Sequence, residues 1–186
     1  MSINTKLRKK LLRMGESDQL LRQEQAILFK QLNKNDAEKN DLTYNSKITK
    51  LSTKLLNLDR KHAEKMKKIV KQFGWPGKSL VGIDGAYAAW LLIQHAVHDR
   101  PFQKRCLKLL TEAVNKNEAD KKNLAYLTDR ILVFEGKEQI YGTQFKGNRF
   151  GKQKPFPIYK SRGLNKRRRD VGLEPFKLYK KKMGVD

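Results

Sequence analysis

Cysteine is nearly absent from this sequence: Cys106 is the only one in 186 residues. A single cysteine excludes an intrachain disulfide, and a zinc site would need other ligands. Cys106 lies on the apolar face of a predicted helix, which favours a small core residue over a nucleophile. The chain also has no run of 18 or more apolar residues and no apolar signal segment at its start, so we expect no transmembrane helix and a cytoplasmic protein.

Acidic residues are scarce, since 19 Asp and Glu stand against 42 Lys and Arg, for a net charge of +23. The excess lies at the two ends, and residues 73–145 are nearly balanced with 10 basic and 8 acidic residues. A positive field of this size attracts polyanions and favours nucleic acid or an acidic membrane surface as partner. Lysine-rich composition on solvated helix faces explains the same excess, because Lys outnumbers Arg by 30 to 12. Both interpretations stay open.

The motifs of several common enzyme classes are also missing. The glycines at 77, 82 and 85 follow no predicted strand and match neither a Walker loop nor a dinucleotide fingerprint. No serine or cysteine lies in a nucleophile motif, which disfavours a covalent mechanism. His95, His98 and Asp99 lie close together at the end of a predicted helix but lack the HxxxH and HExxH spacings. We therefore expect neither a metal nor a cofactor.

Apolar residues at spacings of three and four predict amphipathic helices over residues 5–32 and 44–73, which most simply form an antiparallel helical hairpin. Residues 86–97 are apolar on nearly every face and predict a central buried helix. Shorter helices are expected from Arg100, over 121–130, over 164–171 and over 176–183. A polar break at 33–41 and a basic loop at 146–154 interrupt the pattern.

A β-hairpin is predicted after the helix at 121–130. Residues 131–135 form its first strand, Gly136 and Lys137 its turn, and residues 138–145 its second strand. The fold class is then mainly α, a single-domain helical array over residues 1–186 with one small β-hairpin. Residues 1–73 hold the N-terminal helical hairpin, 74–145 the central helices and the β-hairpin, and 146–186 a basic C-terminal extension with a terminal helix.

Polar side chains at positions expected to be buried are the candidates for a site, because such groups need partners. Asp18 and Arg22 lie four residues apart on the apolar seam of the first helix, either as an ordinary ion pair or facing a polar pocket. The remaining candidates of this kind come from the buried helix and from the predicted β-hairpin with the helix before it: Gln94, His95, Asp129, Arg130, Gln139, Tyr141, Thr143 and Gln144. The three arginines at 167–169 are typical of a solvated or polyanion-facing surface, but one of them, for which we take Arg168, could instead reach inward to anchor a carboxylate or phosphate.

Seven segments in a fixed order carry a resemblance to a known family. They are DQLLR at 18–22, GWPG at 74–77, WLLIQHAVHD at 90–99, FQ at 102–103, LAYLTDR at 124–130, QIYGTQF at 139–145 and LNKRRRDVGLEP at 164–175. The pattern resembles a bacterial family known only as a domain of unknown function, and it covers almost the whole chain. The resemblance implies a shared fold and supplies no activity.

The main functional hypothesis is a polar pocket between the buried helix and the β-hairpin that binds a small polar or anionic ligand. His95 would act as general acid or base, with Asp129 or Asp18 as orienting carboxylate, and Arg130 or Arg168 would stabilise a developing anion. Hydrolysis or group transfer is the expected chemistry, and whether the protein is an enzyme stays open. The ligand-binding candidates are Asp18, Arg22, Gln94, Gln139, Tyr141, Thr143, Gln144 and Arg168.

The alternative is a binding module in which the polar residues only stabilise the fold. The basic ends would contact nucleic acid, with aromatic residues stacking on bases or instead anchoring the C-terminal segment: Phe150, Phe156, Tyr159, Phe176 and Tyr179. The N-terminal helices could also pair with another protein chain. The oligomeric state stays open, because a hairpin within one chain satisfies the same apolar stripe.

Overall fold

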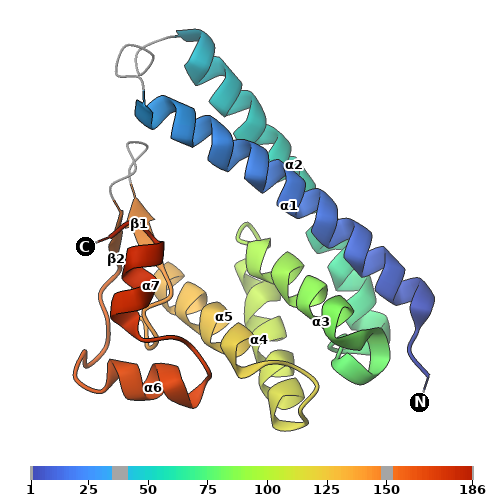
Figure 1. Ribbon diagram of the computed structural model, residues 1–186. Helices are drawn as coiled ribbons and strands as arrows, with labels where there is room; N and C mark the ends of the chain where they lie inside the picture. Colours follow the sequence, from blue (N-terminus) through green and yellow to red (C-terminus); the bar gives the residue numbers. More distant parts are fainter. Residues whose placement is uncertain (1, 35–41, 148–152, 186) are drawn as a thin grey trace. The chain divides into compact units, whose positions relative to one another are not determined.

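The computed structural model describes residues 2–34, 42–147 and 153–185. These residues form seven helices and one two-stranded antiparallel sheet, which confirms the mainly α fold class (Figure 1). The chain divides into two compact units, residues 1–99 and residues 100–186. The single-domain organisation stays a prediction. None of the helices described is long and apolar enough to cross a membrane.

Unit 1 is built on the predicted helical hairpin. Helices α1 (Thr5–Lys34) and α2 (Leu42–Phe73) run antiparallel, and α3 (Lys78–His95) packs against both near the open end of the hairpin (Figure 1). Gly15 lets α1 approach α3 closely, because a Cβ there would lie 3.3 Å from the Cβ of Ala88. The core is made of aliphatic side chains from all three helices, including Leu7, Leu11, Met14, Leu51, Leu55, Met66, Ile69, Leu92 and Ile93.

Helix α3 is the buried helix that the apolar segment predicts, and ten of its residues, from Val81 to Gln94, are buried. It begins earlier than expected, at Lys78, and is interrupted at Gly82, whose φ of 76° and ψ of 170° are not helical. This positive φ suits glycine because it has no Cβ. The interruption explains why the sequence around Gly82 resembles a loop. His95 is the last residue of α3 and contacts Asp18 and Arg22 of α1.

Unit 2 begins with α4 (Arg100–Asn115) and α5 (Lys121–Phe134), which pack against each other. Their shared core includes Phe102, Cys106, Leu110 and Leu127, and the fully buried Cys106 agrees with its interpretation as a core residue. Two short helices, α6 (Leu164–Asp170) and α7 (Phe176–Lys182), follow the sheet and contact each other.

The predicted position of the β-hairpin is wrong. Residues 131–134 continue α5, and Gly136 ends that helix in a Schellman motif with a φ of 72°. Its amide donates to the carbonyl of Val133, and the amide of Lys137 donates to that of Leu132. A glycine that closes a helix and a glycine in a tight hairpin turn both need positive φ, so the residue type alone does not separate them.

The sheet lies further along the chain. Strands β1 (Phe145–Gly147) and β2 (Gln153–Pro155) pair antiparallel, with Phe145 opposite Pro155. The predicted basic loop at 146–154 falls mainly on residues 148–152, and the polar break at 33–41 mainly on 35–41, which lie outside the described ranges. Between α5 and β1 the segment 138–144 has no regular structure beyond an isolated bridge of Gln139 with Ile158. This irregular segment holds four of the candidate site residues.

Candidate functional site

A cluster of charged side chains joins the three helices of unit 1. Asp18 and Arg22 come from α1, Asp59 from α2 and His95 from α3. Arg22 donates from Nε to both Asp18 oxygens at 3.2 Å and from Nη2 to Asp59 at 2.7 Å. Both carboxylates are buried, with Asp18 at 0% and Asp59 at 8% exposure. The ion pair of Asp18 and Arg22, one of the two alternatives drawn from the sequence, is therefore present as part of a larger buried cluster.

His95 contacts this cluster through its Nδ1 atom. Nδ1 lies 2.9 Å and 3.0 Å from the two carboxylate oxygens of Asp18. Gln19 donates a further hydrogen bond to Asp18 at 2.8 Å. A fully buried carboxylate with several donors around it is held firmly in place. Of the two carboxylates that the sequence offered for His95, the structure thus brings Asp18 into contact.

The contacts of Nδ1 are compatible with two positions of the proton on the neutral His95 ring. Nδ1 also lies 3.0 Å from Nε of Arg22, so it could accept from Arg22 or donate to Asp18, but not both. The Asp18 carboxylate can only accept hydrogen bonds, and Arg22 already donates to both of its oxygens. Arg22 therefore does not need Nδ1 as an acceptor. If Nδ1 donates to Asp18 instead, both the Arg22 Nε–H and the His95 N–H have an acceptor. This donation puts the proton of the neutral ring on Nδ1 and the lone pair on Nε2.

The pKa values of the two carboxylates in the cluster are shifted in opposite directions. Burial raises the pKa of Asp18, but the hydrogen bond and charge of His95, with the charge of Arg22, outweigh it, so the pKa lies below its usual value. Burial also raises the pKa of Asp59, and there the contacts with Arg22 only partly offset it, so the pKa lies above its usual value. Asp18 is thus the member of the pair that stays charged most readily.

His62 lies beside this cluster and was not among the predicted site residues. It is 4% exposed, its Nε2 is 3.5 Å from the hydroxyl of Ser17, and its Nδ1 has no hydrogen-bond partner among the described residues. Burial lowers the pKa of His62, so the ring stays neutral near pH 7. Asp59 was also missed. Their signal in the sequence was a polar pair three residues apart on the apolar stripe of α2.

In unit 2, Asp129 is the centre of a second polar cluster. Its fully buried carboxylate accepts backbone hydrogen bonds from Ile140 at 2.7 Å, Tyr141 at 3.0 Å and Thr143 at 2.9 Å. The Thr143 hydroxyl donates a fourth at 2.9 Å. Burial raises the pKa of Asp129, and these four donors act in the opposite direction without outweighing it. The carboxylate replaces the strand partners that the irregular segment lacks.

Gln139 has a similar structural part in unit 2. Its side chain is fully buried, accepts from the amide of Gln144 at 2.8 Å and donates to the carbonyls of Gln144 and Phe156 at 2.9 Å. The Gln144 side chain accepts from Arg130 at 3.2 Å and donates to the Thr143 hydroxyl at 2.9 Å. The predicted ligand-binding amides are therefore engaged in holding segment 138–144 in its shape.

Arg168 extends this cluster from α6. It is fully buried and donates to the carbonyls of Tyr141 at 2.6 Å and Glu174 at 2.7 Å, and its guanidinium carbon lies 4.8 Å from the ring centre of Tyr179. Burial lowers the pKa of Arg168. Its Nη2 is buried without a hydrogen-bond partner in the described part of the chain. Arg168 thus fixes the turn at 141–142 to the C-terminal segment.

Comparison with known proteins gives one match. A family model described as "Family of unknown function (DUF6624)" matches residues 5–184. The chain belongs to this family. Neither the curated proteins nor the solved structures give a match. Membership in DUF6624 agrees with the resemblance drawn from the sequence and brings no activity with it.

The structure thus sorts the predicted site residues of this DUF6624 member into two groups. Asp18, Arg22 and His95 meet in unit 1, where the neighbouring Gln94 is buried in α3. Asp129, Gln139, Thr143, Gln144 and Arg168 belong to the unit 2 cluster, with Arg130 bonded to Gln144 and the Tyr141 backbone held at both its amide and its carbonyl. The predicted pocket, which draws on both groups, stays a prediction.

The C-terminal aromatic residues bear on the nucleic-acid alternative. Phe176 stacks with Phe145 at 6.3 Å, Tyr179 meets Phe145 edge-on at 5.6 Å, and both rings contact Arg168. These two rings therefore anchor the C-terminal segment to unit 2. Tyr159 is exposed, while Phe150 lies outside the described residues. Over the described ranges, no group of three or more His, Cys, Asp or Glu side chains is arranged to hold a metal ion.

Proposed function

We propose that unit 1 carries an acid–base site in which His95 transfers protons and Asp18 positions its imidazole. The observation that supports this most is the 2.9 Å contact between Nδ1 of His95 and the fully buried Asp18 carboxylate. A carboxylate on one ring nitrogen fixes the tautomer and stabilises the imidazolium that forms when the other nitrogen takes a proton. His95 is 16% exposed at its side chain, so the ring is partly accessible.

The charge balance of the cluster supports a base. With neutral His95, the two carboxylates and Arg22 carry a net charge of −1, and protonation of His95 brings the cluster to neutrality. A buried cluster gains stability when its charge is balanced. A ligand that gives up a proton to Nε2 would therefore leave behind a stabilised imidazolium, as needed for general base catalysis.

The substrate we infer is a small polar molecule, and the reaction is hydrolysis or group transfer by acid–base catalysis. The net charge of +23 attracts anionic ligands over a long range, which extends the proposal to small anions. The unit 2 side chains Asp129, Gln139 and Arg168 are assigned to stabilising their own segment, because their hydrogen bonds go to its backbone. A cytoplasmic location belongs to the same proposal and depends on the single cysteine.

A thermal-shift screen tests this proposal. Wild-type protein, His95→Gln and His98→Gln are melted in the presence of nucleotides, sugar phosphates, amino acids and short RNA. His98 is the matched control, because it is an exposed histidine three residues away in unit 1. A ligand that raises the Tm of wild type and His98→Gln, and not of His95→Gln, supports the site. Equal shifts in all three proteins, or shifts with RNA alone at low salt, would contradict it.

A further inference from the structure

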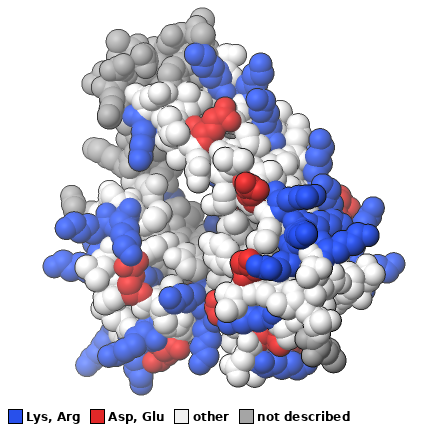
Figure 2. Space-filling model, turned by 45° about the vertical axis from the view of Figure 1, so that its right-hand side comes forward, with Lys and Arg blue, Asp and Glu red and all other residues white. Residues whose placement is uncertain are grey.

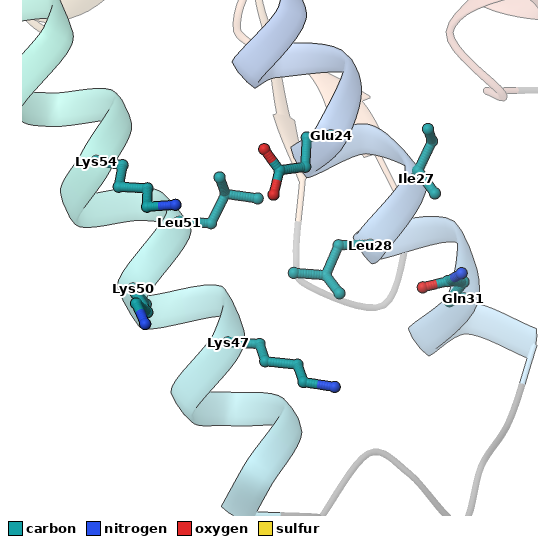
Figure 3. Close-up of a pocket in the computed structure, with 8 residues that line it drawn as sticks. All are labelled: Glu24, Ile27, Leu28, Gln31, Lys47, Lys50, Leu51 and Lys54. Atoms are coloured by element: carbon teal, nitrogen blue, oxygen red, sulfur yellow. The ribbon is translucent and has the colours of Figure 1, made fainter.

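A groove lies between α1 and α2 toward the closed end of the helical hairpin, away from His95. Its volume is about 310 Å³. Figure 3 shows Glu24 and Leu28 of α1 and Lys47, Leu51 and Lys54 of α2 directed toward the space between the two helices. Ile27, Gln31 and Lys50 complete the lining. The groove is therefore apolar at its base and has lysines along its α2 side.

The lysines of this wall belong to a longer stripe. Six exposed lysines of α2 recur at intervals of three, four and seven residues and so share one face of the helix: Lys47, Lys50, Lys54, Lys61, Lys65 and Lys68. The stripe spans about 30 Å at 1.5 Å per residue. Over residues 2–34, 42–147 and 153–185, none of these six lysines takes part in an ion pair. Figure 2 shows Lys and Arg side chains over much of one face, with smaller patches of Asp and Glu between them.

Such a stripe costs stability in the isolated protein. Like charges three or four residues apart on a helix repel one another, and the stripe contains four such pairs. Elsewhere on α2 the arrangement differs, since Lys67 is bonded to Glu64 at 2.7 Å and to Asp99 at 2.6 Å. Glu24 is the acidic side chain in the groove lining, so the charge of Lys47, Lys50 and Lys54 is only partly offset there, and an acidic partner would balance the rest.

The apolar part of the surface narrows the choice of partner. Ile27 on the rim is 58% exposed, and Leu20, two helical turns earlier on α1, is 61% exposed. Apolar residues seven positions apart on a helix are typical of contacts with another helix, because they repeat on one side every two turns. The shallow space between two antiparallel helices is also where a third helix packs in a bundle.

We propose that this groove binds an acidic amphipathic helix of a partner protein. The apolar side of that helix covers Ile27, Leu28 and Leu51, and its carboxylates pair with Lys47, Lys50 and Lys54. This is helix-in-groove recognition with electrostatic complementarity. A second copy docked through the same groove does not fit, because it would bring its own lysine stripe against the first. Nucleic acid would pair with the lysines but leave Ile27 uncovered.

The test uses a fluorescently labelled synthetic peptide of about 18 residues, long enough to form a helix, with Leu at spacings of three and four and Glu on both flanks. A scrambled peptide of the same composition keeps the charge and loses the apolar face. Fluorescence anisotropy measures binding of each peptide to the full chain. We expect the scrambled peptide to bind about tenfold more weakly, because its apolar residues no longer lie on one side.

Two variants with matched controls locate the site. The triple variant Lys47→Glu, Lys50→Glu, Lys54→Glu should weaken binding of the amphipathic peptide about tenfold or more. The control with the same change in net charge is Lys121→Glu, Lys177→Glu, Lys181→Glu in unit 2, and it should bind within about twofold of wild type. Ile27→Gln should weaken binding several-fold more than Leu56→Gln, an exposed leucine of α2 outside the groove lining. Circular dichroism melts check that every variant is folded.

Three results would overturn the proposal. Equal binding of the amphipathic and scrambled peptides would mean unspecific charge attraction. An equal loss in the two triple variants would mean that net charge alone matters. The third result is that the peptide does not bind, while wild type binds a short RNA duplex or phosphatidylglycerol vesicles and only the groove variant loses that binding. This result would assign the stripe to a polyanion or a membrane surface.

Discussion

Asp18 and His95 are 77 residues apart in the chain, and the Asp18 carboxylate lies 2.9 Å from Nδ1 of His95. The contact joins the first and third helices, and Arg22 extends it to Asp59 on the second. One buried carboxylate thus positions the imidazole of the proposed site and links the three helices of unit 1. The variants below separate these two roles.

Asp18→Asn removes the charge that Arg22 and His95 share while keeping the side-chain volume. We expect a loss of about 2 kcal/mol in the free energy of unfolding, because hydrogen bonds to a buried charged group are lost. Urea unfolding followed by circular dichroism measures it. Asp84→Asn is the control, since Asp84 forms an exposed ion pair with Arg8 and should cost clearly less. Equal losses in the two variants would contradict a buried, energetically important Asp18.

The pH dependence of stability should have opposite signs at Asp18 and Asp59. The pKa of Asp18 is lowered in the folded protein, so the unfolded chain binds its proton first as the pH falls. The stability that Asp18 contributes is therefore present above about pH 4 and is lost as the pH falls through the folded pKa. The advantage of wild type over Asp18→Asn should shrink under acid.

Asp59 has a raised pKa, so the folded protein binds its proton first. Its contribution is present below about pH 4 and is lost as the pH rises through the folded pKa. As the pH rises through the folded pKa of Asp59, wild type should therefore lose stability relative to Asp59→Asn. Urea unfolding at a series of pH values compares each variant with wild type. If the stability difference from wild type changes with pH in the same direction for both variants, the pKa values of Asp18 and Asp59 are not shifted in opposite directions.

Asp129→Asn should destabilise unit 2 by about 3 kcal/mol, because an amide cannot accept all four hydrogen bonds and leaves buried backbone donors unsatisfied. Hydrogen exchange should show faster exchange at the amides of Ile140, Tyr141 and Thr143. Thr143→Val removes one donor and should cost about 1 kcal/mol. Unchanged exchange at these amides would mean that the segment keeps its shape without Asp129.

Arg168→Lys tests the unit 2 cluster from its other side. Lysine keeps the charge but cannot reach the carbonyls of Tyr141 and Glu174 with a planar fork, so we expect a loss of about 2 kcal/mol. Arg169→Lys is the matched control on the same helix, because Arg169 is exposed, and it should change stability by less than about 0.5 kcal/mol. If Arg168→Lys leaves the free energy of unfolding unchanged, Arg168 does not have the structural role assigned to it.

The sequence predicted the helices well because their signal is local. The apolar stripes of α1 and α2 and the uniformly apolar α3 each specify a helix within one segment. The end of α5 was misplaced because Ile131, Val133 and Phe134 favour a strand by residue type, while packing of α5 on α4 keeps them helical. Gly136 fitted either interpretation, and only the Schellman hydrogen bonds decide between them.

The polar residues show a similar limit. Burial or half-burial of Asp18, His95 and Asp129 could be expected from their positions, but not which group each would contact. Burial of Arg168 was not the expectation for a run of three arginines, which is typical of a solvated surface. Asp18 and Asp129 were equivalent candidates for His95 in the sequence, and the folded chain puts Asp18 on the imidazole and the backbone of segment 138–144 on Asp129. Partners between distant segments depend on tertiary packing, which residue spacing along one helix does not encode.

The central claim is that Asp18 holds His95 with its proton on Nδ1 and its lone pair on Nε2. Nitrogen NMR of protein labelled with ¹⁵N histidine measures this directly, because protonated and unprotonated ring nitrogens have well separated shifts. His95→Gln assigns the signals, and Asp18→Asn tests their origin. We predict a protonated Nδ1 in the neutral ring of wild type and a changed tautomer balance in Asp18→Asn. A proton on Nε2 in wild type, with Nδ1 accepting from Arg22, would contradict the proposed acid–base site.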